Sequence, residues 1–235
     1  MFFPEKINIK KNYKVLEIGP GNTPFYKSNV LLEKKFTKEE FDKQTGLTGG
    51  DSFGKKIIYY SGDTFPFSDH EFDYVICSHV LEHIPMEKIH IFISEISRVA
   101  SKGYIEIPLY SYELLYNLDV HMSYINVDEN NKLYFFNKEA NHESQKYKDL
   151  RKIFQGNGLL GRIVGNNEDL FISGFEWRGG IDFEILKTIE DLKRVKNIDF
   201  TSILLKENYI KSILKKTNAT RFKQAIFNRF GIRMK

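Results

Sequence analysis

Five short apolar segments of the chain end in residues that could bind a ligand or move a proton. Nearly continuous apolar runs of this length predict strands buried in a parallel sheet. The carboxyl ends of parallel strands meet at one edge of the sheet, where ligands bind. Carboxylates, a hydroxyl and an imidazole are therefore expected at one edge. The segments and the residues after them are 13–18 with Gly19, 30–32 with Glu33, 56–60 with Asp63, 72–77 with Ser78 and His79, and 103–107 with Pro108.

The first of these segments ends in the turn Glu17-Ile18-Gly19-Pro20-Gly21. Glycines at positions 19 and 21 let the backbone approach a ligand closely, because no Cβ atom stands in the way. A carboxylate two residues before the first glycine suits a cationic ligand better than a pyrophosphate. The dinucleotide-binding fingerprint requires a third glycine that opens a helix, and Asn22-Thr23-Pro24 stands in its place. The turn therefore disfavours a dinucleotide.

The elements around these strands predict an α/β fold. Residues 86–100 show apolar positions at helical spacing, which predicts a crossover helix between two parallel strands. Residues 132–136 and 170–177 predict two more strands, with a polar helix over 141–154 between them. We therefore expect a Rossmann-like, doubly wound, mostly parallel sheet of seven strands.

Charge divides the chain of 235 residues into two parts. Residues 1–186 carry 22 basic and 27 acidic side chains, whereas residues 187–235 carry 13 basic and 4 acidic ones. This change of sign predicts a domain over 1–186 and a basic extension over 187–235. Helical patterns over 199–216 and 217–230 make the extension helical.

Three motifs together resemble those of the class I S-adenosylmethionine-dependent methyltransferases, and among these the methyltransferase type 11 family. They are the turn at 15–21, the segment Gly62-Asp63-Thr64-Phe65-Pro66-Phe67, and the segment that runs from Phe72 to Ile84. Their order and spacing are similar to those of the family's first, third and fourth motifs, and the resemblance covers residues 13–108. It implies an enzyme with S-adenosyl-L-methionine as its cofactor.

The resemblance also implies a role for each matching residue in binding the cofactor. Glu17 would face its amino-acid end, with Gly19 and Gly21 making room, and Glu33 would accept hydrogen bonds from the ribose. Asp63 and Thr64 would lie beside the adenine, and Ser78 and His79 would line the floor under the methionine part. Only residues 22–29 separate the first two strands, so we expect the first helix of the family's fold to be very short or missing.

Three histidines are candidates for a general base if the methyl acceptor is a hydroxyl. Imidazole is the side chain best matched to proton transfer near neutral pH. His79 and His83 follow the fourth strand, and His121 follows the fifth. The expected acceptor is a small molecule or a glycan or lipid-linked group. Two alternatives stay open: an inactive cofactor-binding module that docks on a membrane or a partner, and an RNA methyltransferase.

His79-Val80-Leu81-Glu82-His83 also matches the H-x-x-E-H pattern of a class of zinc proteases. That pattern requires two histidines one turn apart on a long helix and a further ligand. Here the segment follows a buried strand directly, and Pro85 limits any helix. The sequence therefore predicts no metal site.

The single cysteine and the absence of an apolar run of about 20 residues favour a cytoplasmic protein without disulfides. From Asn208 to the end there are 8 basic side chains and no acidic one. A basic amphipathic segment can lie on an anionic membrane, bind nucleic acid or pack on the body of the protein. The sequence leaves two possibilities open, packing on the body and peripheral membrane contact through 208–235, and it disfavours nucleic acid because no RNA-binding motif is present.

Overall fold

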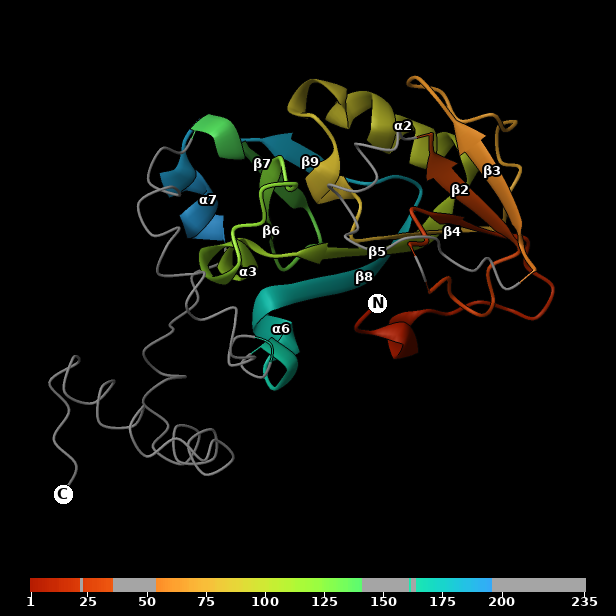
Figure 1. Cartoon of the computed structure of the whole chain (residues 1–235), viewed down its shortest axis with the longest axis horizontal. Helices are drawn as coiled ribbons and strands as arrows, with labels where there is room; N and C mark the ends of the chain where they lie inside the picture. The colour runs from red at the N-terminus through yellow and green to blue at the C-terminus, as the bar shows by residue number, and fades with distance from the viewer. Residues whose placement is uncertain (22, 36–53, 141–160, 162–163, 196–235) are drawn as a thin grey trace, which may run out of the picture. The chain divides into compact units, whose positions relative to one another are not determined.

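The computed structural model describes the chain apart from residues 22, 36–53, 141–160, 162–163 and 196–235 (Figure 1). Met1–Lys196 form one compact unit and Asn197–Lys235 a second one. The predicted helices over 141–154, 199–216 and 217–230 lie outside the described residues. In the part that is described, no helix is long and apolar enough to cross a membrane.

A six-stranded sheet forms the centre of the first unit, in the order β3-β2-β1-β4-β5-β8. All neighbours are parallel except β8, which runs antiparallel to β5. This order is that of a Rossmann-like fold with a reversed edge strand, so the predicted fold class is confirmed. The strands are β1 (Val15–Ile18), β2 (Val30–Lys34), β3 (Lys56–Tyr60), β4 (Tyr74–Ser78), β5 (Lys102–Pro108) and β8 (Ile172–Arg178).

A helix covers one face of this sheet, and the N-terminal segment covers the other (Figure 1). On one face, helix α2 (Ile89–Val99) buries Phe92, Ile93 and Ile96 against the strands. A 3-10 turn, η3 (Met86–Lys88), precedes it, so the helix predicted over 86–100 is confirmed. On the other face, the N-terminal segment with turn η1 (Pro4–Lys6) packs Ile7 on the sheet.

A second sheet explains why the main sheet has six described strands where seven were expected. The strand predicted at 132–136 forms β7 (Leu133–Asn137), which pairs with β6 (Ser123–Val127) and β9 (Phe183–Ile185) and not with the main sheet. Neither β6 nor β9 was predicted from the sequence. Helix α7 (Ile189–Val195) packs Leu192 against this sheet, so the charge change near residue 187 falls inside the first compact unit.

Short elements complete the connections. Between β1 and β2 no helix occurs in the described residues, as the length of the connection predicted. Turn η2 follows β4 directly, and its three residues are too few for a metalloprotease helix. The remaining elements are η2 (Leu81–His83), α3 (Tyr110–Leu115), η4 (Lys138–Ala140) and α6 (Glu168–Phe171).

Gly103 allows β4, β5 and β8 to pack closely. A Cβ atom at this position would lie 2.2 Å from the Val75 carbonyl oxygen and 2.9 Å from Trp177 Nε1.

We expect Gly103→Ala to lower the free energy of unfolding by about 1–3 kcal/mol, because the backbone of β4 at Val75 would have to move away from the new Cβ atom. Chemical denaturation measures the change. Gly165→Ala is the control, since its Cβ would meet no described atom within 4 Å, and equal stability of both variants would contradict this account.

Candidate functional site

Strand register brings most of the predicted cofactor residues to one edge of the main sheet. Ile18, the last residue of β1, pairs with Leu32 of β2 and Cys77 of β4. Gly19, Glu33 and Ser78 each follow these paired residues and therefore lie at the same carboxyl edge. The structure thus collects three of the five strand ends that the sequence singled out.

Glu17 ties down the short connection between β1 and β2. Its Oε2 atom accepts hydrogen bonds from the Phe25 N–H at 2.8 Å and the Ser28 hydroxyl at 2.7 Å. Burial raises the pKa of the Glu17 carboxyl, although these two hydrogen bonds oppose the shift. The carboxylate therefore has a structural role that the sequence did not reveal. It anchors the loop between β1 and β2, which replaces the first helix of the family's fold.

The two glycines of the turn differ in what surrounds them. Gly19 has φ +62°, and a Cβ there would lie 2.5 Å from Val80 Cγ2, so packing as well as backbone conformation requires glycine. Gly21 has φ +56°, and its Cβ would meet no described atom within 4 Å. The open space that the sequence analysis assigned to both positions is thus found at Gly21.

The acids beyond β2 and β3 differ in their surroundings. Burial raises the pKa of Glu33, whose Oε1 accepts a hydrogen bond from the Lys34 N–H. Asp63 is exposed and forms an ion pair with Lys88 at 2.7 Å, and Thr64 beside it is exposed too. A ligand that used Asp63 would therefore have to compete with Lys88.

Glu106 in β5 is the buried charge at this edge that the sequence analysis missed. Its side chain has no solvent exposure and accepts hydrogen bonds from the N–H groups of Phe2 and Phe3 and from the hydroxyls of Ser78 and Tyr104. Burial raises its pKa, but His79 and these donors outweigh that effect and bring the pKa of Glu106 to about 2. An acid in the apolar run Tyr104-Ile105-Glu106-Ile107 was the one available signal.

His79 lies between two buried carboxylates. Its Nε2 atom is 3.2 Å from Glu106 Oε1, and its Nδ1 atom is 3.5 Å from Glu82 Oε1. Burial lowers the pKa of His79, but the two carboxylates raise it more, to about 9. Its backbone has φ +56°, a left-handed conformation that is uncommon for a residue with a side chain. His79 therefore keeps its proton at neutral pH, which makes it a poor general base.

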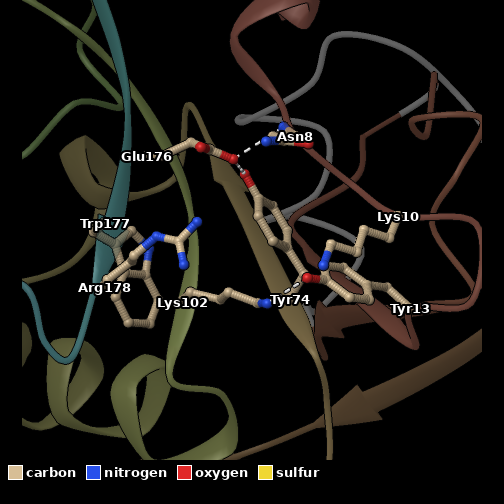
Figure 2. Close-up of a pocket in the computed structure, with 8 residues that line it drawn as sticks. All are labelled: Asn8, Lys10, Tyr13, Tyr74, Lys102, Glu176, Trp177 and Arg178. Atoms are coloured by element: carbon tan, nitrogen blue, oxygen red, sulfur yellow. Dashed lines mark hydrogen bonds between the residues drawn. The ribbon is translucent and has the colours of Figure 1, made fainter.

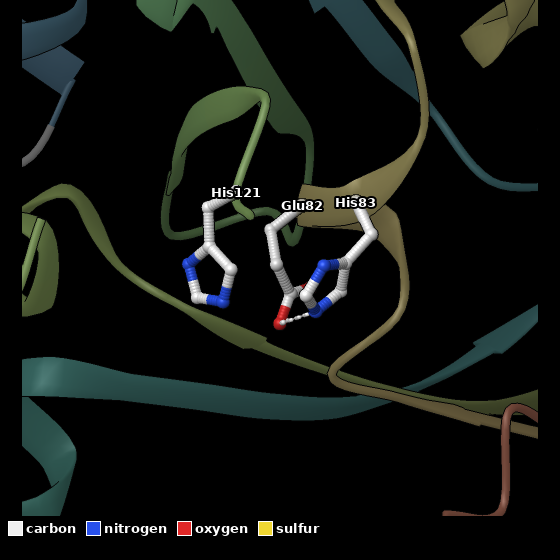
Figure 3. Close-up of side chains that lie close together, drawn as sticks. All are labelled: Glu82, His83 and His121. Atoms are coloured by element: carbon white, nitrogen blue, oxygen red, sulfur yellow. Dashed lines mark ion pairs between the residues drawn. The ribbon is translucent and has the colours of Figure 1, made fainter. Parts of the chain in front are cut away.

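Glu82, His83 and His121 lie close together (Figure 3), and Glu82 is also the second carboxylate next to His79. One ligand atom of each residue lies within 4.8 Å of the others. Burial lowers the pKa of His83, although the Glu82 carboxylate opposes that shift. The His83 and His121 rings meet edge to face, with centroids 4.7 Å apart. Two of the three predicted base candidates are thus neighbours, although 37 residues separate them from one another along the chain.

Hydrogen bonds from neighbouring segments hold the His121 ring and the backbone of η2 in place. His121 Nδ1 lies 2.6 Å from Glu113 Oε1, and Glu113 also accepts a hydrogen bond from Lys138. The Met122 N–H donates to the Glu82 carbonyl at 2.7 Å, so the segment before β6 is bonded to η2. The cluster is therefore built from η2, α3 and the start of the second sheet.

A polar pocket lies at the other edge of the main sheet (Figure 2). It is lined by Tyr74 and Lys102, the first residues of β4 and β5, so it lies at the amino ends of the strands. The Tyr74 hydroxyl donates a hydrogen bond to Glu176 at 2.6 Å, and Lys102 donates one to the Tyr13 hydroxyl. These groups satisfy one another, and the pocket is separate from the predicted site.

Comparison with known families supports the resemblance seen in the motifs. The family model described as "Methyltransferase domain" matches residues 34–105, from the last residue of β2 into β5. The resemblance to class I S-adenosylmethionine-dependent methyltransferases is thereby confirmed over this segment, and the match implies S-adenosylmethionine as the cofactor. The matched segment contains the motifs at 62–67 and 72–84, and the glycine turn at 15–21 precedes it.

Solved structures with a similar arrangement are distant in sequence. The PH0226 protein of Pyrococcus horikoshii is 20% identical with a TM-score of 0.34, and the similarity covers 52% of this chain and 61% of that one. An S-adenosylmethionine-dependent methyltransferase of Mesorhizobium loti is 11% identical (TM-score 0.31; 52% and 56% covered). One of Methanosarcina mazei is 18% identical (TM-score 0.31; 52% and 69% covered). This chain thus spans about three fifths of the first structure's length. No curated protein sequence matches it.

Glu106 makes the stability of the protein sensitive to acid. Because its pKa lies near 2 in the folded protein and at about 4.5 when unfolded, its stabilisation is complete above about pH 4.5 and is lost as the pH falls toward 2. A shift of this size corresponds to about 3 kcal/mol. We expect the free energy of unfolding of Glu106→Gln to fall less steeply over this pH range than that of the wild type. Denaturation at several pH values measures the slope. Glu129→Gln, at an exposed position, is the control, and parallel curves for wild type and Glu106→Gln would refute the assignment.

Proposed function

We propose that the protein binds S-adenosylmethionine at the carboxyl edge of the main sheet and transfers its methyl group to an acceptor. One observation carries this proposal: the methyltransferase-domain match over 34–105 follows the glycine turn at the end of β1 in the chain, and Gly21 of that turn faces open space. The central position of β1 in the strand order supports it further, because ligands of such sheets bind where the strand order reverses.

In this proposal each residue at the edge has a defined part in binding the cofactor. The Gly19–Gly21 turn admits the amino-acid end of the cofactor, and Glu17 holds the loop beside it while supplying negative charge. The remaining roles are ribose binding by Glu33, adenine contact by Asp63 and Thr64, and the floor under the methionine part by Ser78 and His79. The partly exposed, cationic His79 is neutralised by Glu106 and Glu82, which keeps its charge from opposing the sulfonium.

The transfer itself asks mainly for alignment. The nucleophile attacks the methyl group in line with the sulfonium, and holding both reactants in that geometry can lower the barrier by about 7–11 kcal/mol. For a hydroxyl acceptor, His83 and His121 are the proposed bases, because His79 keeps its proton. We propose a small molecule or a glycan or lipid-linked group as the acceptor.

The first test uses a glycine whose neighbouring space the cofactor needs. Asparagine tolerates a positive φ, so Gly21→Asn keeps the turn while filling that space. We expect its affinity for S-adenosylmethionine to fall at least about tenfold, which equals about 1.4 kcal/mol, with little loss of stability. Calorimetry measures the binding. Gly179→Asn is the matched control, because Gly179 has φ +75° and open space after β8, next to the amino end of β5.

Equal affinity of Gly21→Asn and wild type would contradict cofactor binding at this turn. Supplying wild type with labelled cofactor and fractions of a cell extract then tests transfer, by formation of S-adenosylhomocysteine and of a labelled product. Cofactor binding with no product from any fraction would favour the inactive binding module. A labelled RNA would favour the RNA methyltransferase.

We also propose that residues 208–235 contact an anionic membrane surface. The support is the charge of this segment, which has 8 basic side chains and no acidic one. We expect the full chain with Lys215→Glu and Lys216→Glu to bind vesicles that contain phosphatidylserine more weakly than wild type, by about tenfold for a loss of 1.4 kcal/mol. Sedimentation with vesicles measures this. Lys10→Glu with Lys11→Glu is the control, and unchanged vesicle binding after the tail substitutions would count against membrane contact.

A further inference from the structure

Glu82 is a buried carboxylate without a hydrogen-bond donor. Its side chain is 1% exposed, and neither of its oxygens accepts a hydrogen bond from any described residue. A buried carboxylate normally has several such donors, because burial of an unsatisfied charge costs several kcal/mol. Its nearest cationic partner, His79, is 3.5 Å away and is shared with Glu106. This carboxylate therefore has room for a further positive partner.

Two imidazoles next to Glu82 are held with the same ring nitrogen facing away from it. His83 Nδ1 lies 3.1 Å from the Val120 carbonyl oxygen, which can only accept a hydrogen bond. His121 Nδ1 lies 2.6 Å from the Glu113 carboxylate, which also accepts. Both rings must therefore carry their proton on Nδ1 to make these bonds. In the neutral form of either ring the lone pair is then on Nε2.

This arrangement is the one that proteins use to orient histidine ligands of a metal ion. A ligating histidine almost always donates its other N–H to a carboxylate or a backbone carbonyl, which fixes the ring and its tautomer. Here one histidine has each kind of partner. Figure 3 shows the Glu82 carboxylate next to the His83 ring, with His121 on its other side. Three ligand groups from two separate stretches of the chain thus converge.

We propose that Glu82, His83 and His121 bind a divalent transition-metal ion such as Zn²⁺ through one carboxylate oxygen and two Nε2 atoms. Imidazole donors suit zinc and its neighbours better than magnesium or calcium. Tetrahedral bonds of about 2.0–2.2 Å place ligand atoms about 3.3–3.6 Å apart. The present separations of up to 4.8 Å would therefore have to shorten by about 1 Å when the ion binds.

The metal site differs from the protease pattern in the sequence. His79, the first histidine of that pattern, is engaged with Glu106 and is not among the proposed ligands. His121, which lies outside the pattern, takes its place. Three protein ligands leave at least one coordination position open. With His83 and His121 bound to the ion through Nε2 and protonated on Nδ1, neither ring can act as the general base. In the metal-bound protein the ion itself would then bind a hydroxyl acceptor and lower its pKa; this step rests on the proposed methyl transfer, but the metal site does not.

Titration of the chelator-treated full-length protein with ZnCl₂ tests the proposal. Calorimetry should give one zinc ion per chain for the wild type. We expect Glu82→Gln and His83→Gln to weaken binding at least about 100-fold, and Glu113→Gln, which alters the group that positions His121, to weaken it about 10–100-fold. His70→Asn is the matched control: this exposed histidine has φ +52°, which asparagine tolerates, and its loss should leave zinc binding unchanged.

Circular dichroism identifies any variant that fails to fold, and the wild-type titration decides the question even then. A wild type without a stoichiometric zinc site would overturn the proposal. So would Glu82→Gln and His83→Gln that fold and bind zinc as tightly as wild type. A parallel titration with MgCl₂ tests the donor set, and tight magnesium binding without zinc binding would also refute it. None of these readouts uses methyltransferase activity, so the proposed function and the metal site fail separately.

Discussion

The burial of a carboxylate, Glu106, in β5 at the carboxyl edge of the main sheet is the constraint on which the candidate site depends. An ionised group in this position is stable only if donors surround it. The N-terminal segment supplies two backbone N–H groups, and Ser78 and Tyr104 supply two hydroxyls. These bonds join the first residues of the chain to the carboxyl edge of β4 and β5. The face of the sheet that the N-terminal segment covers is therefore stabilised by a buried polar group as well as by apolar packing.

His79 extends this network from the sheet to the loop that follows β4. It contacts Glu106 with one ring nitrogen and approaches Glu82 with the other, so the two carboxylates share one cation. Its left-handed backbone turns the chain sharply into η2, and such conformations persist where surrounding contacts enforce them. The predicted cofactor floor and the proposed metal ligands are thus linked through the contacts of His79 with Glu106 and Glu82.

Local patterns predicted the main sheet well, whereas contacts between distant residues were beyond them. Apolar runs identified β1 to β5, and helical spacing identified α2, because burial imposes these periods directly. The sequence could not show that β7 leaves the main sheet, since an apolar run does not name its partner strand. It also could not show that His121 meets Glu82, or that Glu17 binds Phe25 and Ser28. Glu17, Glu33 and Asp63 were found by their positions at strand ends, but Glu106 was missed. The partners of these carboxylates come from other segments of the chain, which no local period predicts.

The second sheet is attached to η2 by a backbone bond, from the Met122 N–H to the Glu82 carbonyl, and by the contact of His83 with the Val120 carbonyl. These contacts connect the segment before β6 directly to the loop after β4. A redesign that replaced the second sheet would also have to replace these two contacts to η2. Without them, the loop that carries His79, Glu82 and His83 would lose the segment that packs on it, even if every residue of the main sheet were kept.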